Sequence, residues 1–137
     1  MNKSTIREVT FKLLYSLEIQ KNHENDSIEV FLENSEVKED KVKENIKNDI
    51  KCIYEKNEEI ISQISDNLKS DWKLERISKI NIALLKLSIY EMLYKKVPYK
   101  VVINEVVELA KKFGEETSSS FINGVLATVV KKNFLAD

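Results

Sequence analysis

VPYKVVINEVVELAKKFGEETSSSFINGVL, residues 97–126, is the stretch that decides the fold of this 137-residue chain, because it holds the only proline and both glycines. Pro98 predicts the end of the helix before it, since the residue preceding a proline avoids the α region. Gly114 predicts the end of the next helix, as a C′ glycine with positive φ. A last helix is expected to start beside Thr117 or Ser118, whose side-chain oxygens can cap it.

Apolar spacing supports both of these helices, because each places its apolar residues on one face. The face of the first consists of Val102, Ile103, Val106, Val107, Ala110 and Phe113, and that of the second consists of Ile122, Val125, Leu126, Val129 and Val130. Gly124 lies inside the second helix, where glycine costs about 1 kcal/mol relative to alanine. We therefore expect another helix to approach closely at Gly124.

The segment before Pro98 predicts the centre of the fold. Between Leu74 and Tyr94 apolar residues occur on almost every side of a helix, and Ile77–Tyr94 is one long apolar run. A helix that is apolar nearly all round is normally buried among other helices. Trp72 is expected to start this C-terminal half of the chain.

The N-terminal half predicts helices separated by polar breaks. A first helix, capped by Ser4 or Thr5, is expected to run to about Gln20. Its apolar stripe is Ile6, Val9, Leu13, Leu14 and Leu17. The next three segments are expected to be a loop, a short helix and a second break, at Lys21–Ser27, Ile28–Leu32 and Asn34–Asp40. A long amphipathic segment, Val42–Leu68, follows and is expected to break into two helices at Lys56-Asn57.

Composition favours an all-α fold and one domain. Glycine and proline are scarce, Lys and Glu are abundant, and 137 residues suffice for one core. The 22 basic and 23 acidic residues argue against a strongly basic nucleic-acid binder. With a single cysteine no intrachain disulfide can form, and no signal-peptide or membrane-length apolar run is present. We therefore expect a cytoplasmic protein.

The residue pattern does not predict catalysis, a metal site or a cofactor. His23 lies alone in a polar loop, where a solvated side chain is the simpler interpretation. Cys52 lies on a helix in apolar company, which favours a small buried hydrophobe over a reactive thiol. The four carboxylates between Glu105 and Glu116 are explained by a helix surface and an acidic link. Neither G-x-G-x-x-G nor G-K-[ST] occurs.

Basic and aromatic residues are the candidates for binding. Arg76, Lys79 and Lys86 would share one face of the buried helix, where surface salt bridges are the simpler interpretation and phosphate contacts the alternative. Lys3 and Arg7 lie one turn apart at the start of the first helix, where positive charge opposes the helix dipole. That arrangement suits a phosphate site and an ordinary exposed terminus equally.

Two aromatic residues are placed at the edge of apolar stripes. Tyr15 lies beside the stripe of the first helix, and Phe121 precedes Ile122 on the last helix. From composition alone such a ring belongs to the core. An exposed edge ring near basic residues would instead stack on an RNA base.

The quoted stretch resembles the C-terminal signature of the NusB transcription antitermination factors. In that family P-Y-K-x-x-I-N-E-x-x-E-L-A-K-x-F-G is followed by an acidic, serine-rich link and then F-[VI]-N-G-V-L. Residues 72–93, WKLERISKINIALLKLSIYEML, resemble the preceding helix of the family, and residues 7–18, REVTFKLLYSLE, resemble its first helix. Only residues from about 22 to 70 match in pattern alone.

The resemblance implies a compact bundle of about six or seven helices in two packed halves, about 1–70 and 71–137. It also implies binding of boxA-like, single-stranded RNA from ribosomal RNA leader transcripts, together with the small-subunit ribosomal protein that doubles as NusE. The pair would join an RNA polymerase antitermination complex, without a covalent step. Both monomers and homodimers occur in the family, and the apolar stripes here would serve either.

The resemblance also marks RNA-binding positions. The family's arginine-rich N-terminus falls before Arg7 and includes Lys3, and its first-helix and last-helix aromatics fall on Tyr15 and Phe121. Two further positions fall on Asn81 and near Thr117, which are neutral here where some relatives carry acidic residues. MNKSTIR also holds one lysine and one arginine in place of an arginine run. We therefore expect weak RNA binding by the chain alone.

Two other functions remain open from the sequence. Similar helical domains precede the catalytic domain of ribosomal RNA cytosine methyltransferases, although this chain ends at Asp137, soon after its last expected helix. A helical module that binds only protein would also fit the balanced charge. RNA titration with and without a NusE-type partner separates these functions.

Overall fold

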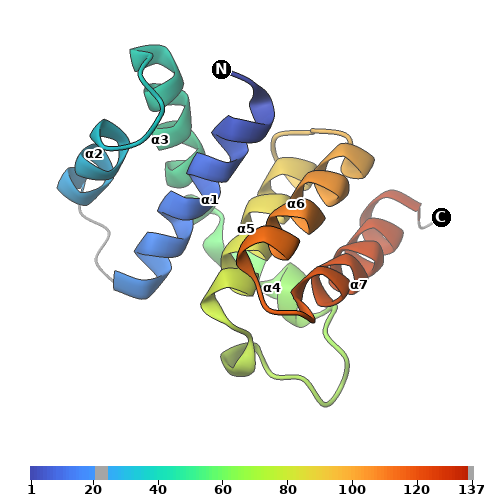
Figure 1. The fold of residues 1–137 in the computed structure, drawn as a ribbon. Coiled ribbons are helices and arrows are strands. Elements are labelled where there is room, and N and C mark those ends of the chain that lie inside the picture. Colours follow the sequence, from blue (N-terminus) through green and yellow to red (C-terminus); the bar gives the residue numbers. More distant parts are fainter. Residues whose placement is uncertain (21–24, 136–137) are drawn as a thin grey trace. The chain divides into compact units, whose positions relative to one another are not determined.

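The computed structural model describes residues 1–20 and 25–135, and these residues form helices without any strand (Figure 1). Two compact units divide the chain, Met1–Glu55 and Lys56–Asp137. The first unit holds α1 (Lys3–Gln20), α2 (Asn25–Glu33) and α3 (Asp40–Glu55). The second holds α4 (Asn57–Ser65), the 3-10 helix η1 (Leu74–Arg76), α5 (Lys79–Leu93), α6 (Tyr99–Phe113), α7 (Ser118–Val130) and the π-helix η2 (Lys131–Leu135). The predicted all-α class is confirmed.

Helix α1 packs against α3 within the first unit. Most of its predicted stripe is buried, and α3 contributes its own buried isoleucines; the buried residues are Val9, Leu13, Leu14, Leu17, Ile46, Ile50 and Ile53. The predicted cap at Ser4 or Thr5 is wrong. Asn2 caps the helix instead, because its Oδ1 accepts a hydrogen bond from the Thr5 N–H at 2.8 Å.

Helix α2 is longer than the predicted Ile28–Leu32 and starts at Asn25, inside the predicted loop. Residues 21–24, including His23, lie outside the described residues. The second polar break is confirmed between Glu33 and Asp40. An ion pair between Glu29 and Lys47 links α2 to α3, and the Glu29 carboxylate is the main cause that raises the pKa of Lys47.

The predicted break at Lys56-Asn57 is confirmed, since α3 ends at Glu55 and α4 starts at Asn57. Helix α4 packs against α5 and α7 and belongs to the second compact unit. The Tyr94 hydroxyl donates to the Glu59 carboxylate at 2.5 Å and ties the end of α5 to α4. Burial, followed by this hydrogen bond, raises the pKa of Tyr94 to about 12.

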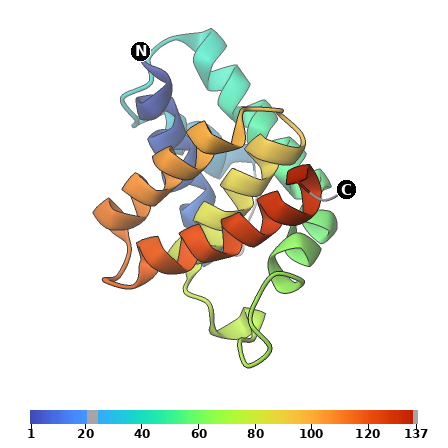
Figure 2. The ribbon, with the colours of Figure 1, turned by 90° about the vertical axis from the view of Figure 1, so that its right-hand side faces the viewer.

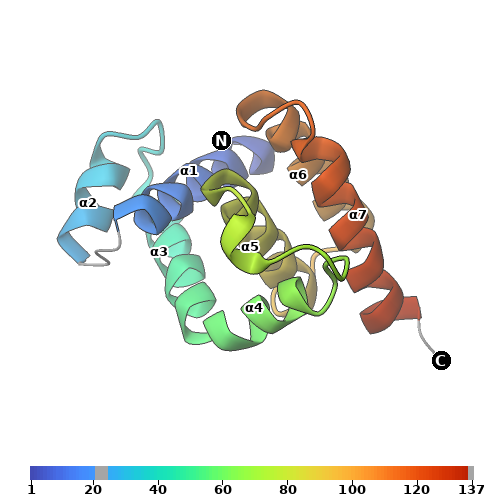
Figure 3. The same ribbon diagram turned by 90° about the horizontal axis from the view of Figure 1, so that it is seen from below.

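Helix α5 is the centre of the second unit, because it packs against α4, α6 and α7. Every residue from Ile82 to Met92 is buried, as its all-round apolar pattern predicts. Figure 2 shows α6 and α7 side by side with α5 behind them, and Figure 3 shows the long link between α4 and α5. Helix α5 starts at Lys79, where the Ser78 Oγ accepts from the Asn81 N–H at 3.2 Å. Pro98 is the N-cap of α6, as expected.

The positions of the two glycines relative to α6 and α7 are as predicted, but the reasons for glycine there are not. Gly114 follows α6 as expected, but its φ is −90°, so no left-handed conformation requires glycine there. Space requires it instead, because a Cβ would lie 2.6 Å from the Ser118 Oγ and 2.8 Å from the Ala110 carbonyl oxygen. Gly124 is exposed, and a Cβ there meets no atom within 4 Å. The predicted close approach of a helix at Gly124 is therefore wrong.

This contrast leads to a stability prediction for the two alanine variants. Gly114→Ala is expected to lower the free energy of unfolding by about 1–3 kcal/mol, because Ser118 and the Ala110 carbonyl must move. Gly124→Ala is expected to raise it by about 0.5–1 kcal/mol, since alanine is the better helix former and the site is open. Urea denaturation of both variants measures the difference. A stabilised Gly114→Ala or a destabilised Gly124→Ala would contradict the packing seen at these positions.

Candidate functional site

Four of the residues singled out in the sequence line one pocket of the second unit: Arg76, Asn81, Thr117 and Phe121. We call this cavity of about 670 Å³ the α5–α7 pocket. Its walls come from the α4–α5 link, the start of α5, the link before α7 and α7 itself as far as Thr128. The pocket therefore gathers residues that lie up to 61 positions apart between Asn67 and Thr128.

The link between α6 and α7 sets the position of Phe121. The buried Ser118 turns its Oγ back to accept from the Glu115 N–H at 2.9 Å, next to Gly114. Helix α7 starts at Ser118 with Thr117 as its N-cap residue. Neither side chain caps the helix, so the predicted cap is wrong; the Thr117 carbonyl accepts from the Phe121 N–H at 3.1 Å. This tight turn leaves Thr117 exposed and Phe121 half-buried, one turn further on.

Phe121 contacts the only tryptophan of the chain. The ring centroids of Trp72 and Phe121 are 5.3 Å apart, and their planes are inclined by 34°. The Trp72 side chain belongs to the α4–α5 link and is 46% exposed. Aromatic pairs at this separation attract each other, so each ring orients the other. The pocket thus presents two aromatic rings, where the sequence predicted one.

Two asparagines supply polar atoms to the same pocket. Asn81 lies in the first turn of α5, and Asn67 follows α4 and is 9% exposed. The Asn67 Nδ2 donates to the Gln63 carbonyl at 2.6 Å. The Oδ1 atoms of both residues are buried and have no hydrogen-bond partner among the described residues. The Oδ1 of Asn57, outside the pocket, is in the same situation, so this feature is not particular to the pocket.

The charge of the pocket is weakly positive. Lys69 and Arg76 are exposed cations on its α4–α5 side, and Glu115 is the one carboxylate among its lining residues. A guanidinium can hold a phosphate through two parallel hydrogen bonds. Phosphate contact by Arg76 is therefore compatible with its position.

The predicted basic stripe on one helix is wrong. Arg76 ends η1, Ile77 is extended, and only Lys79 and Lys86 lie on α5. Lys79 is exposed, whereas Lys86 is 5% exposed and thus does not reach the surface as expected. The extended residue Ile77 separates Arg76 from Lys79 and Lys86. The apolar run of the sequence continues through Ile77 and therefore gives no sign of this break. Of the three, only Arg76 lines the α5–α7 pocket.

The remaining predicted residues lie on α1 in the first unit. Lys3, Arg7, Phe11 and Tyr15 follow one another at intervals of four, so they share one side of the helix. Lys3 is exposed and Tyr15 half-buried, whereas Arg7 is only 9% exposed. The Tyr15 ring stacks on buried Phe11, with centroids 6.2 Å apart. Phe11 therefore orients Tyr15.

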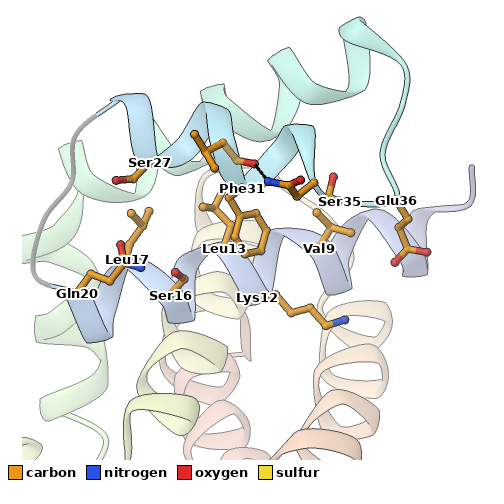
Figure 4. Close-up of a pocket in the computed structure, with 12 residues that line it drawn as sticks. Val9, Lys12, Leu13, Ser16, Leu17, Gln20, Ser27, Phe31, Ser35 and Glu36 are labelled. Atoms are coloured by element: carbon orange, nitrogen blue, oxygen red, sulfur yellow. Dashed lines mark hydrogen bonds between the residues drawn. The ribbon is translucent and has the colours of Figure 1, made fainter.

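A groove of about 720 Å³ between α1 and α2 is a separate feature of the first unit (Figure 4). Figure 4 shows Leu13 and Phe31 inside it, with Lys12 and Glu36 toward one end. None of the predicted RNA-binding residues lines this groove. It therefore adds nothing to the candidate site.

Sequence reasoning missed Trp72 and Asn67. From the sequence, Trp72 marks only the start of the C-terminal half, and the exposure of its ring is seen in the structure alone. Asn67 gave no signal, because its role depends on the fold of the α4–α5 link. Cys52 is half-buried on α3, less buried than predicted. No cluster of metal ligands and no helix able to cross a membrane occurs within residues 1–20 and 25–135.

Fold and pocket together define an all-helical protein with two aromatic rings and two exposed cations at one pocket. The model of the NusB family matches residues 4–131. The transcription antitermination protein NusB of Acetivibrio thermocellus is 42% identical over 137 residues, covering 99% of this chain and 93% of that protein. The chain belongs to the NusB family.

Solved structures agree with this assignment. NusB of T. maritima superposes with a TM-score of 0.84 at 31% identity, covering 96% of this chain and 92% of that one. A chain from a crystal structure of the antitermination factors NusB and NusE in complex with dsRNA also gives a TM-score of 0.84, at 24% identity, covering 95% and 96%. The predicted NusB-like fold is confirmed.

Proposed function

We propose that the chain is a transcription antitermination factor that binds boxA-type, single-stranded RNA together with a NusE-type ribosomal protein. The observation that carries the proposal is the convergence of Asn81, Thr117 and Phe121 on the α5–α7 pocket. These three positions are among those that the resemblance marks for RNA. Membership of a family whose curated relatives are antitermination proteins supports the proposal.

In this proposal the chain acts by assembly and makes no covalent step. Phe121 supplies a face on which an RNA base stacks, and Arg76 supplies a phosphate contact. Lys3 and Tyr15 add contacts from α1, whereas Arg7 offers RNA the least surface of these residues. The RNA-bound pair then joins the RNA polymerase antitermination complex in the cytoplasm.

The similarity to a protein named as a transcription antitermination protein favours this function over the methyltransferase-associated alternative. The protein-only alternative is tested by titrating labelled boxA-type RNA with the chain, with the NusE-type protein, and with both. We expect the pair to bind more tightly than either protein alone. An affinity of the pair equal to that of the NusE-type protein alone would favour the protein-only module. Light scattering of the same samples shows whether a homodimer forms before the partner binds.

Binding by the isolated chain is expected to be weak and only modestly salt-dependent. The formal net charge is −1, and few cations lie at the candidate site. If about three phosphates are contacted, log K should fall against log[salt] with a slope of roughly −2 for single-stranded RNA. Titrations between low and high salt measure this slope. A slope steeper than about −5 would reveal a large basic surface that the candidate site lacks.

A further inference from the structure

Trp72 carries the most exposed aromatic ring of the α5–α7 pocket. Its side chain lines the pocket and is 46% exposed, whereas Phe121 beside it is half-buried. Single exposed apolar residues are common on protein surfaces, so exposure alone indicates nothing. Trp72 differs from such residues because its ring lines a pocket and contacts a second ring. The more accessible aromatic surface of the pocket therefore belongs to Trp72.

The backbone of the α4–α5 link holds Trp72 at the pocket. The Trp72 N–H donates to the Lys69 carbonyl at 2.9 Å, which closes a turn directly before the ring. After it, the Arg76 N–H donates to the Lys73 carbonyl at 3.0 Å, across η1. The side chains of Lys69 and Arg76 are exposed cations that line the same pocket. Along the chain Trp72 thus lies between two cations, and sites for single-stranded nucleic acid combine such aromatic rings with positive charge.

The contact between the two rings limits how a base can bind. Their centroids are 5.3 Å apart, and their planes are inclined by 34°. A base inserted between them would need about 7–8 Å, twice the roughly 3.5–4.0 Å separation of carbon atoms in contact. The pair therefore cannot enclose a base as a clamp, and a base must stack on ring surface outside the contact. Trp72 offers more of that surface, because its ring is larger and more exposed than that of Phe121.

We propose that Trp72 contacts RNA directly, by stacking of one unpaired base on the exposed part of its ring. This contact adds to that of Phe121, whose ring also supports the tryptophan from one side. Stacking does not depend on the identity of the base, since every base has a π-face. Loss of the contact should therefore weaken boxA-type RNA and a shuffled RNA of the same composition alike. The inference rests on the proposed RNA-binding function and adds one residue to that site.

Photocrosslinking of the unaltered protein tests the contact. A series of boxA-type RNAs, each carrying 5-iodouracil at one position, is irradiated in the complex of this chain with the NusE-type protein. The excited base forms a covalent bond preferentially with an aromatic side chain stacked on it. Trypsin cleaves after Lys69 and Lys73, so a crosslink to Trp72 is recovered on residues 70–73, SDWK. We expect this peptide among the crosslinked products, and the result requires no variant to fold.

Trp72→Ala is expected to weaken the RNA affinity of the same complex by about 5- to 150-fold, the effect of one lost stacked base. Trp72→Phe keeps an aromatic face and should retain most of the affinity. Phe134→Ala is the matched control, because Phe134 is 40% exposed and pairs with Tyr99 at 5.7 Å but lies outside the pocket. Its replacement should leave the affinity unchanged. Thermal melts verify that each variant is folded at the temperature of the titration.

A double variant separates direct contact from support of Phe121. In the Phe121→Ala background, Trp72→Ala should still lower the RNA affinity, although contact between the rings can make the two effects non-additive. No further loss in that background would mean that Trp72 only positions Phe121, and would overturn the inference. Parental affinity of Trp72→Ala would also overturn it, as would the absence of residues 70–73 from the crosslinks of a complex that binds RNA. These three results leave the proposed function standing, whereas failure of the complex to bind any RNA would overturn both.

Discussion

Phe121→Ala is expected to weaken the binding of boxA-type RNA by the chain–partner complex by about 5- to 150-fold. This range corresponds to about 1–3 kcal/mol, the usual contribution of one base stacked on an aromatic ring. The fold should lose less than the roughly 3–5 kcal/mol of a fully buried phenylalanine, because Phe121 is half-buried at the rim of the pocket. RNA titration paired with a thermal melt separates the two effects.

Phe113→Ala is the matched control for this variant. Phe113 is also a half-buried phenylalanine in the second unit, at the end of α6, but it does not line the α5–α7 pocket. Its replacement should leave RNA affinity unchanged. Tyr15→Ala is a parallel test on α1 and should also weaken RNA binding. A Phe121→Ala protein that melts far below the parent, while its folded fraction binds RNA normally, would remove Phe121 from the site.

Ile122→Ala is expected to have the opposite profile, although it changes the very next residue. Ile122 has no exposed surface, and its removal should lower the free energy of unfolding by about 2–5 kcal/mol. Below the melting temperature the folded protein should bind RNA with nearly parental affinity, since Ile122 does not line the pocket. Urea denaturation and RNA titration of the same preparation measure both quantities.

The milder variant Ile122→Val provides a reference for the loss of stability expected of Ile122→Ala. It should cost about 0.5–1.5 kcal/mol, because one methylene group is removed from a filled site. A stability of Ile122→Ala equal to that of the parent would mean that α7 does not bury this face. Loss of RNA affinity in the folded Ile122→Ala protein would mean that RNA binding depends on the packing of the core and not on the Phe121 ring at the rim of the pocket.

The sequence predicted helices well where one strong local feature, such as a proline or an all-round apolar pattern, decided the outcome. Pro98 begins α6 as predicted, although α5 already ends at Leu93, and the all-round apolar pattern of α5 predicted its buried centre. Caps were predicted poorly, because several polar residues compete at each helix start and the sequence does not show which one turns inward. Asn2 instead of Ser4 or Thr5 is one example, and Ser118, which bonds to Glu115, is another.

The two glycines and the predicted basic stripe show why predictions from neighbouring residues alone were wrong at other positions. A positive φ and a close neighbour both favour glycine, and only the fold shows that Gly114 meets a close neighbour whereas Gly124 meets none. The stripe failed because it assumed one continuous helix through Ile77. Of the aromatic pair, only Phe121 was predicted as a binding residue, from its position at the edge of an apolar stripe. Trp72 was not, because the long link after α4 brings it to Phe121 only in the folded chain.

The most direct test of the proposed function measures the affinities of two RNAs for the complex of this chain with a NusE-type protein. One is a boxA-type single strand, and the other is a shuffled strand of the same length and composition, so that charge and base content are matched. We expect the boxA-type RNA to bind about tenfold more tightly or better, since base contacts carry the specificity and phosphate contacts are common to both. Equal affinities for the two strands would contradict the account.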